Sequence, residues 1–213
     1  MNKLLIIKLL IYGALAYFIY LLFLITIQYI PINDEAGFLL IKQEEIKIPY
    51  YKISFYGHVY TSIFVICLGF FQFSTTIRKR FSFIHRWFGK FYIFLILFIA
   101  SPTGLIMAYH ANGGLISQIS FILLSILWFV FTLMALLKIK IRLFLQHKNF
   151  MIRSYALTLS AVSLRLFKFL IVYFFELPPM DTYKIVSILG WTINLAIAEL
   201  IVYSMRITKS AKI

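Results

Sequence analysis

The chain has 213 residues, of which 62% are hydrophobic, 19% are aromatic and only 13% are charged. A soluble domain of this length cannot cover so much apolar surface, so the composition excludes an ordinary soluble enzyme and predicts an integral membrane protein. The net charge of +14 leaves this prediction unchanged. The basic residues flank apolar stretches, where they act as topology signals and attract anionic lipid headgroups, so we expect no binding to nucleic acid.

Six apolar stretches of 19 or more residues divide the chain. About 20 apolar residues cross the hydrocarbon core of a bilayer, which is roughly 30 Å thick, and each stretch meets that length. We therefore expect an all-α fold, a bundle of six transmembrane helices forming a single integral membrane domain over residues 1–213. The stretches cover residues 4–29, 56–74, 87–109, 115–137, 154–175 and 183–204.

The charges are sorted between the connections of these stretches. Fifteen of the 21 Lys and Arg residues lie at one set of alternating connections, and six of the seven acidic residues lie at the other. Basic loops stay on the cytoplasmic side because translocation of Lys and Arg is disfavoured. The pattern predicts that both termini are cytoplasmic and that the protein is a multi-pass protein of the inner cell membrane.

The second to fifth stretches, within residues 56–170, form the predicted four-helix core, and the first and last helices are outer elements. Residues 30–55 make the only long loop on the acidic side, which we expect to be a cap with an interfacial helix around residues 38–45. Pro102 lies within the third stretch. It should kink that helix and free a backbone carbonyl near Phe98.

All four histidines lie near the amino-terminal ends of predicted helices. His58 and His110 would share the outer face of the bundle, and His85 and His147 would share the inner face. Imidazole is a common axial ligand of haem iron, and helix bundles hold cofactors between facing helices. The two pairs therefore suggest haem b, with His85 and His147 as the better candidates for ligands of the iron.

The alternative is that these histidines are ordinary polar residues at headgroup depth. His147 lies seven residues before the apolar stretch that begins at Ser154. That separation is about 10 Å at the helical rise of 1.5 Å per residue. An inner haem therefore requires the fifth helix to begin well before Ser154.

Polar side chains form a stripe on each of two predicted helices. Polar groups in hydrocarbon face protein or water, so both stripes should point into the bundle. Ordinary hydrogen bonding between helices would orient them in the same way. The stripe on the second helix is His58, Ser62, Val65, Gly69 and Gln72, and that on the fifth is His147, Met151, Ser154, Thr158, Ala161 and Arg165.

Arg165 is the costliest residue in the chain, because a centred Arg costs roughly 2.5–3.5 kcal/mol on insertion scales. Glu199 is the only acid inside a predicted helix and lies at a similar depth. The two are expected to form an ion pair. Alternatively, Arg165 belongs to a substrate, haem-propionate or proton site, in a polar cavity also lined by Glu199, Gln72 and Thr158.

Several separated motifs resemble a bacterial family of multi-pass membrane proteins, domain of unknown function 2306. The resemblance covers residues 56–170 and implies a membrane protein without an established activity. The order of histidine-bearing helices is also similar to that of the transmembrane di-haem cytochromes b, an analogy of helix order alone. The motifs are Gly57-His58, Gly69 to Phe73, His85 to Tyr92, Gly113-Gly114, Trp128, His147 to Thr158 and Ala161 to Arg165.

The sequence contains no phosphate loop, no zinc-protease motif and no nucleophile elbow, so a classical enzyme is not expected. Three hypotheses follow. The first is a b-type haem protein that transfers electrons, and the second is a carrier or binder of a small molecule with a cavity around Arg165. The third is an assembly subunit without a site of its own. The expected partner is the lipid bilayer, while a redox partner, a small molecule and a homo-oligomer stay open.

Overall fold

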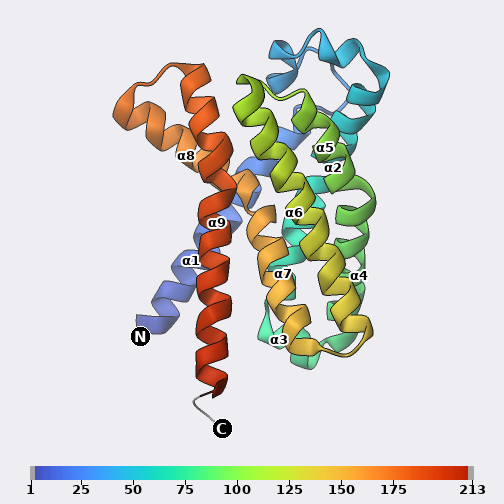
Figure 1. Cartoon of the computed structure of the whole chain (residues 1–213), viewed down its shortest axis with the longest axis vertical. Helices are drawn as coiled ribbons and strands as arrows, with labels where there is room; N and C mark the ends of the chain where they lie inside the picture. The colour runs from blue at the N-terminus through green and yellow to red at the C-terminus, as the bar shows by residue number, and fades with distance from the viewer. Residues whose placement is uncertain (1–2, 211–213) are drawn as a thin grey trace.

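The computed structural model describes residues 3–210, and every element within that range is a helix (Figure 1). The long helices are α1 (Lys3–Ile27), α2 (Pro49–Gln72), α4 (Ser82–Leu95), α5 (Ser101–Tyr109), α6 (Gly114–Lys140), α7 (Phe144–Thr158), α8 (Ser160–Phe175) and α9 (Pro179–Ser210). The short elements are the 3₁₀ turns η1 (Gly37–Ile41) and η2 (Glu45–Lys47), the helix α3 (Thr75–Arg80) and the π turn η3 (Ile96–Ala100).

The all-helical transmembrane bundle is confirmed. Four helical segments are long and apolar enough to cross a membrane, and the bent pair α7–α8 makes a fifth if it is counted as one span. Among the residues searched, α1 contributes a shorter apolar helix, Tyr12–Ile27. The count of six spans and the side on which the termini lie therefore stay predictions. The four segments are Pro49–Gln72, Ser82–Tyr109, Gly114–Lys140 and Pro179–Ile207.

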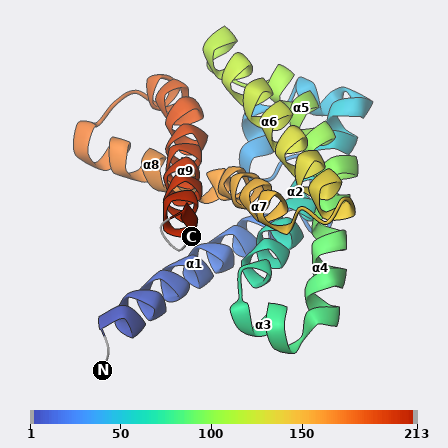
Figure 2. The same cartoon turned by 60° about the horizontal axis from the view of Figure 1, so that its bottom comes forward.

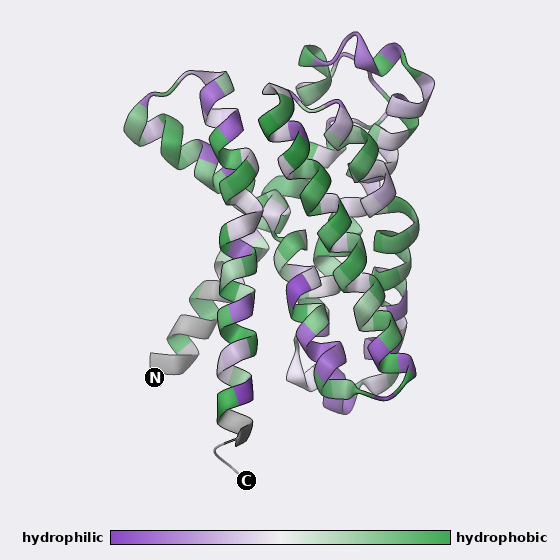
Figure 3. Ribbon diagram, viewed as in Figure 1, coloured by the Kyte–Doolittle hydropathy of each residue, from purple (hydrophilic) through white to green (hydrophobic). Residues whose placement is uncertain are grey.

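The helices α2, α4, α6 and α7 pack side by side, while α1 crosses the bundle obliquely and α9 stands outside it (Figures 1 and 2). In Figure 3, hydrophilic residues gather at the loops and at the lower ends of α4, α6 and α7, with hydrophobic residues between them. We call the end that carries α3 the basic end and the opposite end the cap end. The α1 helix begins, and α9 ends, toward the basic end.

The centre of the bundle holds a cluster of hydrogen-bonded polar side chains. The Tyr92 hydroxyl lies 3.0 Å from Ser154 Oγ and 2.9 Å from Thr158 Oγ1. Trp128 Nε1 donates to Thr158 Oγ1, and Thr132 Oγ1 lies 2.7 Å from Ser154 Oγ. Because an unsatisfied polar group in hydrocarbon costs several kcal/mol, this cluster holds α4, α6 and α7 together.

Distortions interrupt two of the spans. The π turn η3 comes directly before Pro102 in the span Ser82–Tyr109. A proline has no N–H to donate to the carbonyl one turn earlier, so the predicted distortion takes the form of a wider turn. The second distortion is a 41° bend between α7 and α8.

The bend between α7 and α8 was not predicted. Hydroxyl groups on both sides of Leu159 donate to backbone carbonyls of α7: Thr158 Oγ1 to the Ser154 oxygen, and Ser160 Oγ, at the start of α8, to the Leu157 oxygen. Such bonds compete with the helical hydrogen bonds and bend helices. The two halves of the predicted fifth helix therefore take different directions.

The cap end is closed by residues 28–48, which differ from the prediction in two ways. The expected helix at 38–45 is replaced by two short 3₁₀ turns, and α2 begins at Pro49 rather than at Tyr56. Proline is favoured in the first turn of a helix because its missing N–H is not needed there. The side chain of Lys42 is only 1% exposed, and its Nζ donates to Glu45 and to the carbonyl oxygen of His110.

Accessibility of introduced cysteines tests the orientation of the bundle. In a Cys67→Ser background, cysteines at Asn112 and Met180 lie at the cap end, and those at Phe83 and Gln146 lie at the basic end. If basic loops stay inside, an impermeant thiol reagent added to intact cells should label the first two and not the second two. The reverse pattern would place both termini outside, and equal labelling of all four would contradict the bundle.

Acidification should open the cap by protonating Asp34. Lys52 and Tyr56 both donate hydrogen bonds to this carboxylate. The bond from Lys52 holds the pKa of Asp34 below its ordinary value despite the opposing effect of burial. A lowered pKa means that the stabilisation is complete above the ordinary carboxyl value of about 3.9 and is lost as the pH falls from there through the folded value.

Hydrogen exchange of residues 28–48 measures this opening. We expect the protection of these amides in the wild type, relative to the intrinsic exchange rate at each pH, to fall below about pH 4. Asp34→Asn should show the lower protection already at pH 7, because a neutral amide cannot form an ion pair with the Lys52 cation. The matched control is Glu44→Gln, since Glu44 forms an exposed pair with Lys47. Equal effects of both variants would assign the protection to overall charge rather than to Asp34.

Candidate functional site

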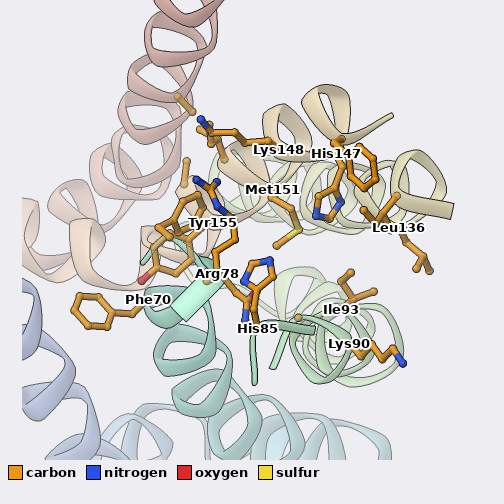
Figure 4. Close-up of a pocket in the computed structure, with 18 of the residues that line it drawn as sticks. Phe70, Arg78, His85, Lys90, Ile93, Leu136, His147, Lys148, Met151 and Tyr155 are labelled. Carbon is orange, nitrogen blue, oxygen red and sulfur yellow. The ribbon is translucent and has the colours of Figure 1, made fainter. Parts of the chain in front are cut away.

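His85 and His147 lie at the basic end and line the same cavity, which has a volume of about 1700 Å³. His85 is in the first turn of α4. His147 is in the first turn of α7, because α7 begins at Phe144, ten residues before the apolar stretch. The extension that an inner haem requires is therefore present. In Figure 4 both imidazoles point into the same space, with Met151 lying between them.

Hydrogen bonding defines the state of the His147 ring. His147 Nδ1 lies 2.8 Å from the carbonyl oxygen of Ala135. A carbonyl only accepts, so Nδ1 carries the proton, and in the neutral ring Nε2 keeps a free lone pair. Metal-binding histidines have this arrangement, in which the second nitrogen donates to a carbonyl that fixes the ring orientation.

The opposite wall of the cavity contains polar atoms without partners. His85 Nδ1 and Gln72 Nε2 are buried, and neither has a hydrogen-bond partner among the described residues. Gly89 makes room for the amide, since a Cβ there would lie 3.2 Å from Gln72 Oε1. Buried polar atoms are nearly always hydrogen-bonded, so two orphans on one wall point to a ligand.

The charge around the cavity is of one sign. Among the described lining residues five are cations and none is acidic. Cations at the mouth of an apolar cavity attract an anionic group such as a carboxylate or a phosphate. The cations are Arg78 on α3, Arg86 and Lys90 on α4, Lys140 on α6 and Lys148 on α7.

The outer histidines have separate partners. His58 Nδ1 lies 2.7 Å from the carbonyl oxygen of Ala100, and the ring packs over Gly104, where a Cβ would be 3.0 Å from it. His110 Nε2 lies 3.1 Å from the Tyr50 hydroxyl at the cap. Neither residue lines the cavity at the basic end. The outer haem pair stays a prediction, and the site described here consists of the inner pair.

The four residues suggested for a polar cavity around Arg165 lie in different places. Only Gln72 lines the cavity at the basic end. Thr158 belongs to the Tyr92 cluster, while Glu199 lines a separate hollow on α9. Arg165 is on α8 and donates to the backbone oxygen of Ala161. The bend at Leu159 explains this separation, because it turns α8 away from the inward stripe of α7.

The predicted Arg165–Glu199 ion pair is wrong. Glu199 instead accepts two hydrogen bonds from Arg153, at 2.5 Å to Nε and 2.7 Å to the terminal nitrogen. The Arg153 guanidinium also packs against the rings of Phe131 and Phe150. Depth along the sequence was a poor guide here, because Glu199 is level with Arg153, which lies 12 residues before Arg165.

The Tyr92 cluster and the Arg78 side chain were missed as parts of the site. Tyr92 sits in a strongly apolar stretch, and only the polar stripe of α7 hinted at a partner for it. Within the part of the chain that the structure describes, no three His, Cys, Asp or Glu side chains gather into a metal site.

In a comparison with protein families, residues 55–202 match the predicted membrane protein family DUF2306. The chain belongs to DUF2306. The DUF2306 region contains all four histidines and extends into α9, whereas α1 and the cap residues 28–48 precede it. Curated proteins and solved structures gave no match, so the likeness of helix order to the cytochromes b stays a prediction.

A double-mutant cycle tests the pairing of Glu199. Residues in direct contact show coupling energies of about 0.5–3 kcal/mol, whereas distant residues are additive to within about 0.5 kcal/mol. Unfolding of the purified protein should therefore show coupling between Arg153→Met and Glu199→Gln. The matched pair, Arg165→Met with Glu199→Gln, should be additive. Coupling of Glu199 to Arg165 alone would overturn the arrangement of α7, α8 and α9.

Proposed function

We propose that this protein binds one haem b at the basic end, with His85 and His147 as axial ligands, and transfers electrons. The observation that carries the proposal is that imidazoles from two different helices face one cavity, lined on one wall by unpartnered polar atoms. Two imidazole ligands are a common solution for a haem that transfers electrons within a helix bundle. When bound, the haem would supply the redox chemistry.

The residues around the inner pair have roles that fit this group. The Ala135 carbonyl orients His147 and leaves Nε2 available. Arg86, Lys90 and Lys140 line the same cavity and would neutralise haem propionates. The apolar walls, which include Ile93 and Leu136, would exclude water from the porphyrin.

Met151 requires a separate test because it lies between the imidazoles. It is one turn from His147 on the same face of α7, and its side chain is buried. A flexible thioether can move aside for a ligand, but methionine is also an axial ligand in some haem proteins. Met151→Leu keeps the volume and removes the sulfur, so it should retain a haem that both histidines ligate.

The proposal includes a location for the haem in the membrane. With the basic end on the cytoplasmic side of the inner membrane, the haem would lie in the inner leaflet, close to cytoplasmic redox partners. The cap would then face outward.

Visible spectroscopy of the purified protein tests the proposal. Protein expressed with sufficient haem should show reduced-minus-oxidised bands of a b-type haem, about one per chain. His85→Gly and His147→Gly should each lower haem retention by more than tenfold, since loss of an outer-shell partner alone costs 10–100-fold. Added imidazole should restore binding to each glycine variant, which a general folding defect would not permit.

The control is His110→Gln, at the cap end, which should keep the full spectrum because its ring contacts Tyr50. Absence of haem bands from the wild type would overturn the proposal. Retention of haem in the His85→Gly/His147→Gly double variant would assign the ligands elsewhere.

A further inference from the structure

The cavity at the basic end is larger than one ligand needs. Its volume of about 1700 Å³ exceeds the roughly 300–1,000 Å³ that is usual for a site holding a single small molecule. The cavity also touches two neighbouring faces of α7. His147 and Met151 lie on one face, and Lys148 and Ile152, each one residue further along, lie about 100° around the helix.

The second face of α7 opposes α9 and forms an apolar groove. Lys148, Ile152 and Ala156 on α7 and Leu159, the residue directly after it, follow helical spacing. From Lys148 to Leu159 is 11 residues, which is about 16 Å at 1.5 Å per residue. This is about half of the roughly 30 Å hydrocarbon core, so the groove is as deep as one leaflet.

The facing stripe on α9 has the same length. It consists of Asn194, Ile197, Ala198, Ile201 and Met205, and its ends are again 11 residues apart. Tyr12 and Leu15 of α1 also line the cavity. The groove thus has apolar walls from three helices over the thickness of one leaflet.

The two ends of the groove differ in polarity. At mid-membrane depth, Asn194 closes the groove: its amide nitrogen donates to the Ala156 carbonyl, and Ser163 donates to its oxygen. At the basic end Lys148 and Arg78 extend toward the α9 side of the cavity (Figure 4). No acidic residue among the described lining residues neutralises them.

We infer that this groove is a specific seat for an anionic phospholipid of the leaflet at the basic end. One acyl chain lies between α7 and α9, and the phosphate sits at Lys148 and Arg78. Basic pockets between transmembrane helices bind lipid headgroups in this way, and the depth of the groove matches one acyl chain. The other nearby cation on α7, Arg153, is already bound by Glu199 and does not line the cavity.

Lipid retention measures the proposed seat. The protein is reconstituted in phosphatidylcholine vesicles that contain a minor fraction of phosphatidylglycerol, extracted in mild detergent and analysed for bound lipid by mass spectrometry. We expect about one phosphatidylglycerol per chain. Lys148→Gln with Arg78→Gln should lower its affinity about 25-fold, because each cation near an anionic headgroup contributes about fivefold.

Two further variants separate the seat from general attraction by basic residues. Lys79→Gln with Lys138→Gln removes the same charge from the same end, but neither residue lines the cavity, so lipid retention should stay unchanged. Ala198→Leu leaves the charge unaltered and fills the groove, because Ala198 is buried and lines it. This variant should lower the retention of phosphatidylglycerol. Its effect on the stability of the protein should not exceed the usual cost of overpacking.

The outcomes decide the inference independently of haem. Equal losses in the Lys148/Arg78 and Lys79/Lys138 variants, or equal retention of phosphatidylcholine, would overturn it. Loss of haem without loss of lipid in the Lys148/Arg78 variant would assign these cations to propionates and would also overturn it. His85→Gly, which tests the haem, should keep the lipid, so failure of one proposal leaves the other measurable.

Discussion

A bilayer provides no water for a buried hydroxyl, so the hydroxyl of Tyr92 must find its hydrogen-bond partners within the bundle. Its phenol is fully buried and bonds to Ser154 and Thr158 on another helix. His85 lies seven residues before Tyr92, and His147 lies seven residues before Ser154. Seven residues are two helical turns, so each imidazole lies on the same face as the hydroxyl that joins the two helices. The Tyr92 cluster therefore holds α4 and α7 in an orientation in which the two imidazoles face each other.

The sequence predicted the features that depend on periodicity and charge. The apolar stretches coincide with helices, and the polar stripe of the fifth helix faces inward from His147 as far as Thr158. The prediction that this stripe continues to Arg165 failed because the helix bends at Leu159. The bend arises from local competition between side-chain hydroxyls and backbone hydrogen bonds. Such competition has no periodic signal, since serine and threonine are common in straight helices as well.

Two further errors concern the position of charged residues along the helices. Depth along the chain suggested Arg165 as the partner of Glu199, but Glu199 pairs with Arg153, which lies 12 residues before Arg165. At the cap, the residues from Pro49 to Phe55 were assigned to the loop over residues 30–55. In the structure Lys52 pairs with Asp34, so its charge is compatible with the first turn of a membrane helix.

The proposed haem site and the proposed lipid groove are two parts of one cavity, and α7 forms a wall of both. A ligand that rigidifies a helix by binding to one face reduces the conformational entropy that is lost when a second ligand binds to the other face. The positive charge at the mouth of the cavity attracts anionic groups to both parts. An acidic residue introduced there would compete with either occupant for the same cations.

The π turn η3 has a consequence for the register of its span. Tyr92 faces α7, and Ser101, nine residues later, donates to the Ser125 carbonyl on α6. In a continuous α-helix these two residues would point about 180° apart. The extra residue of a π turn reduces the difference to about 80°, which allows one span to satisfy both neighbours. The turn thus accommodates one residue more than a regular α-helix of the same length would, and here chain length and helix face are uncoupled.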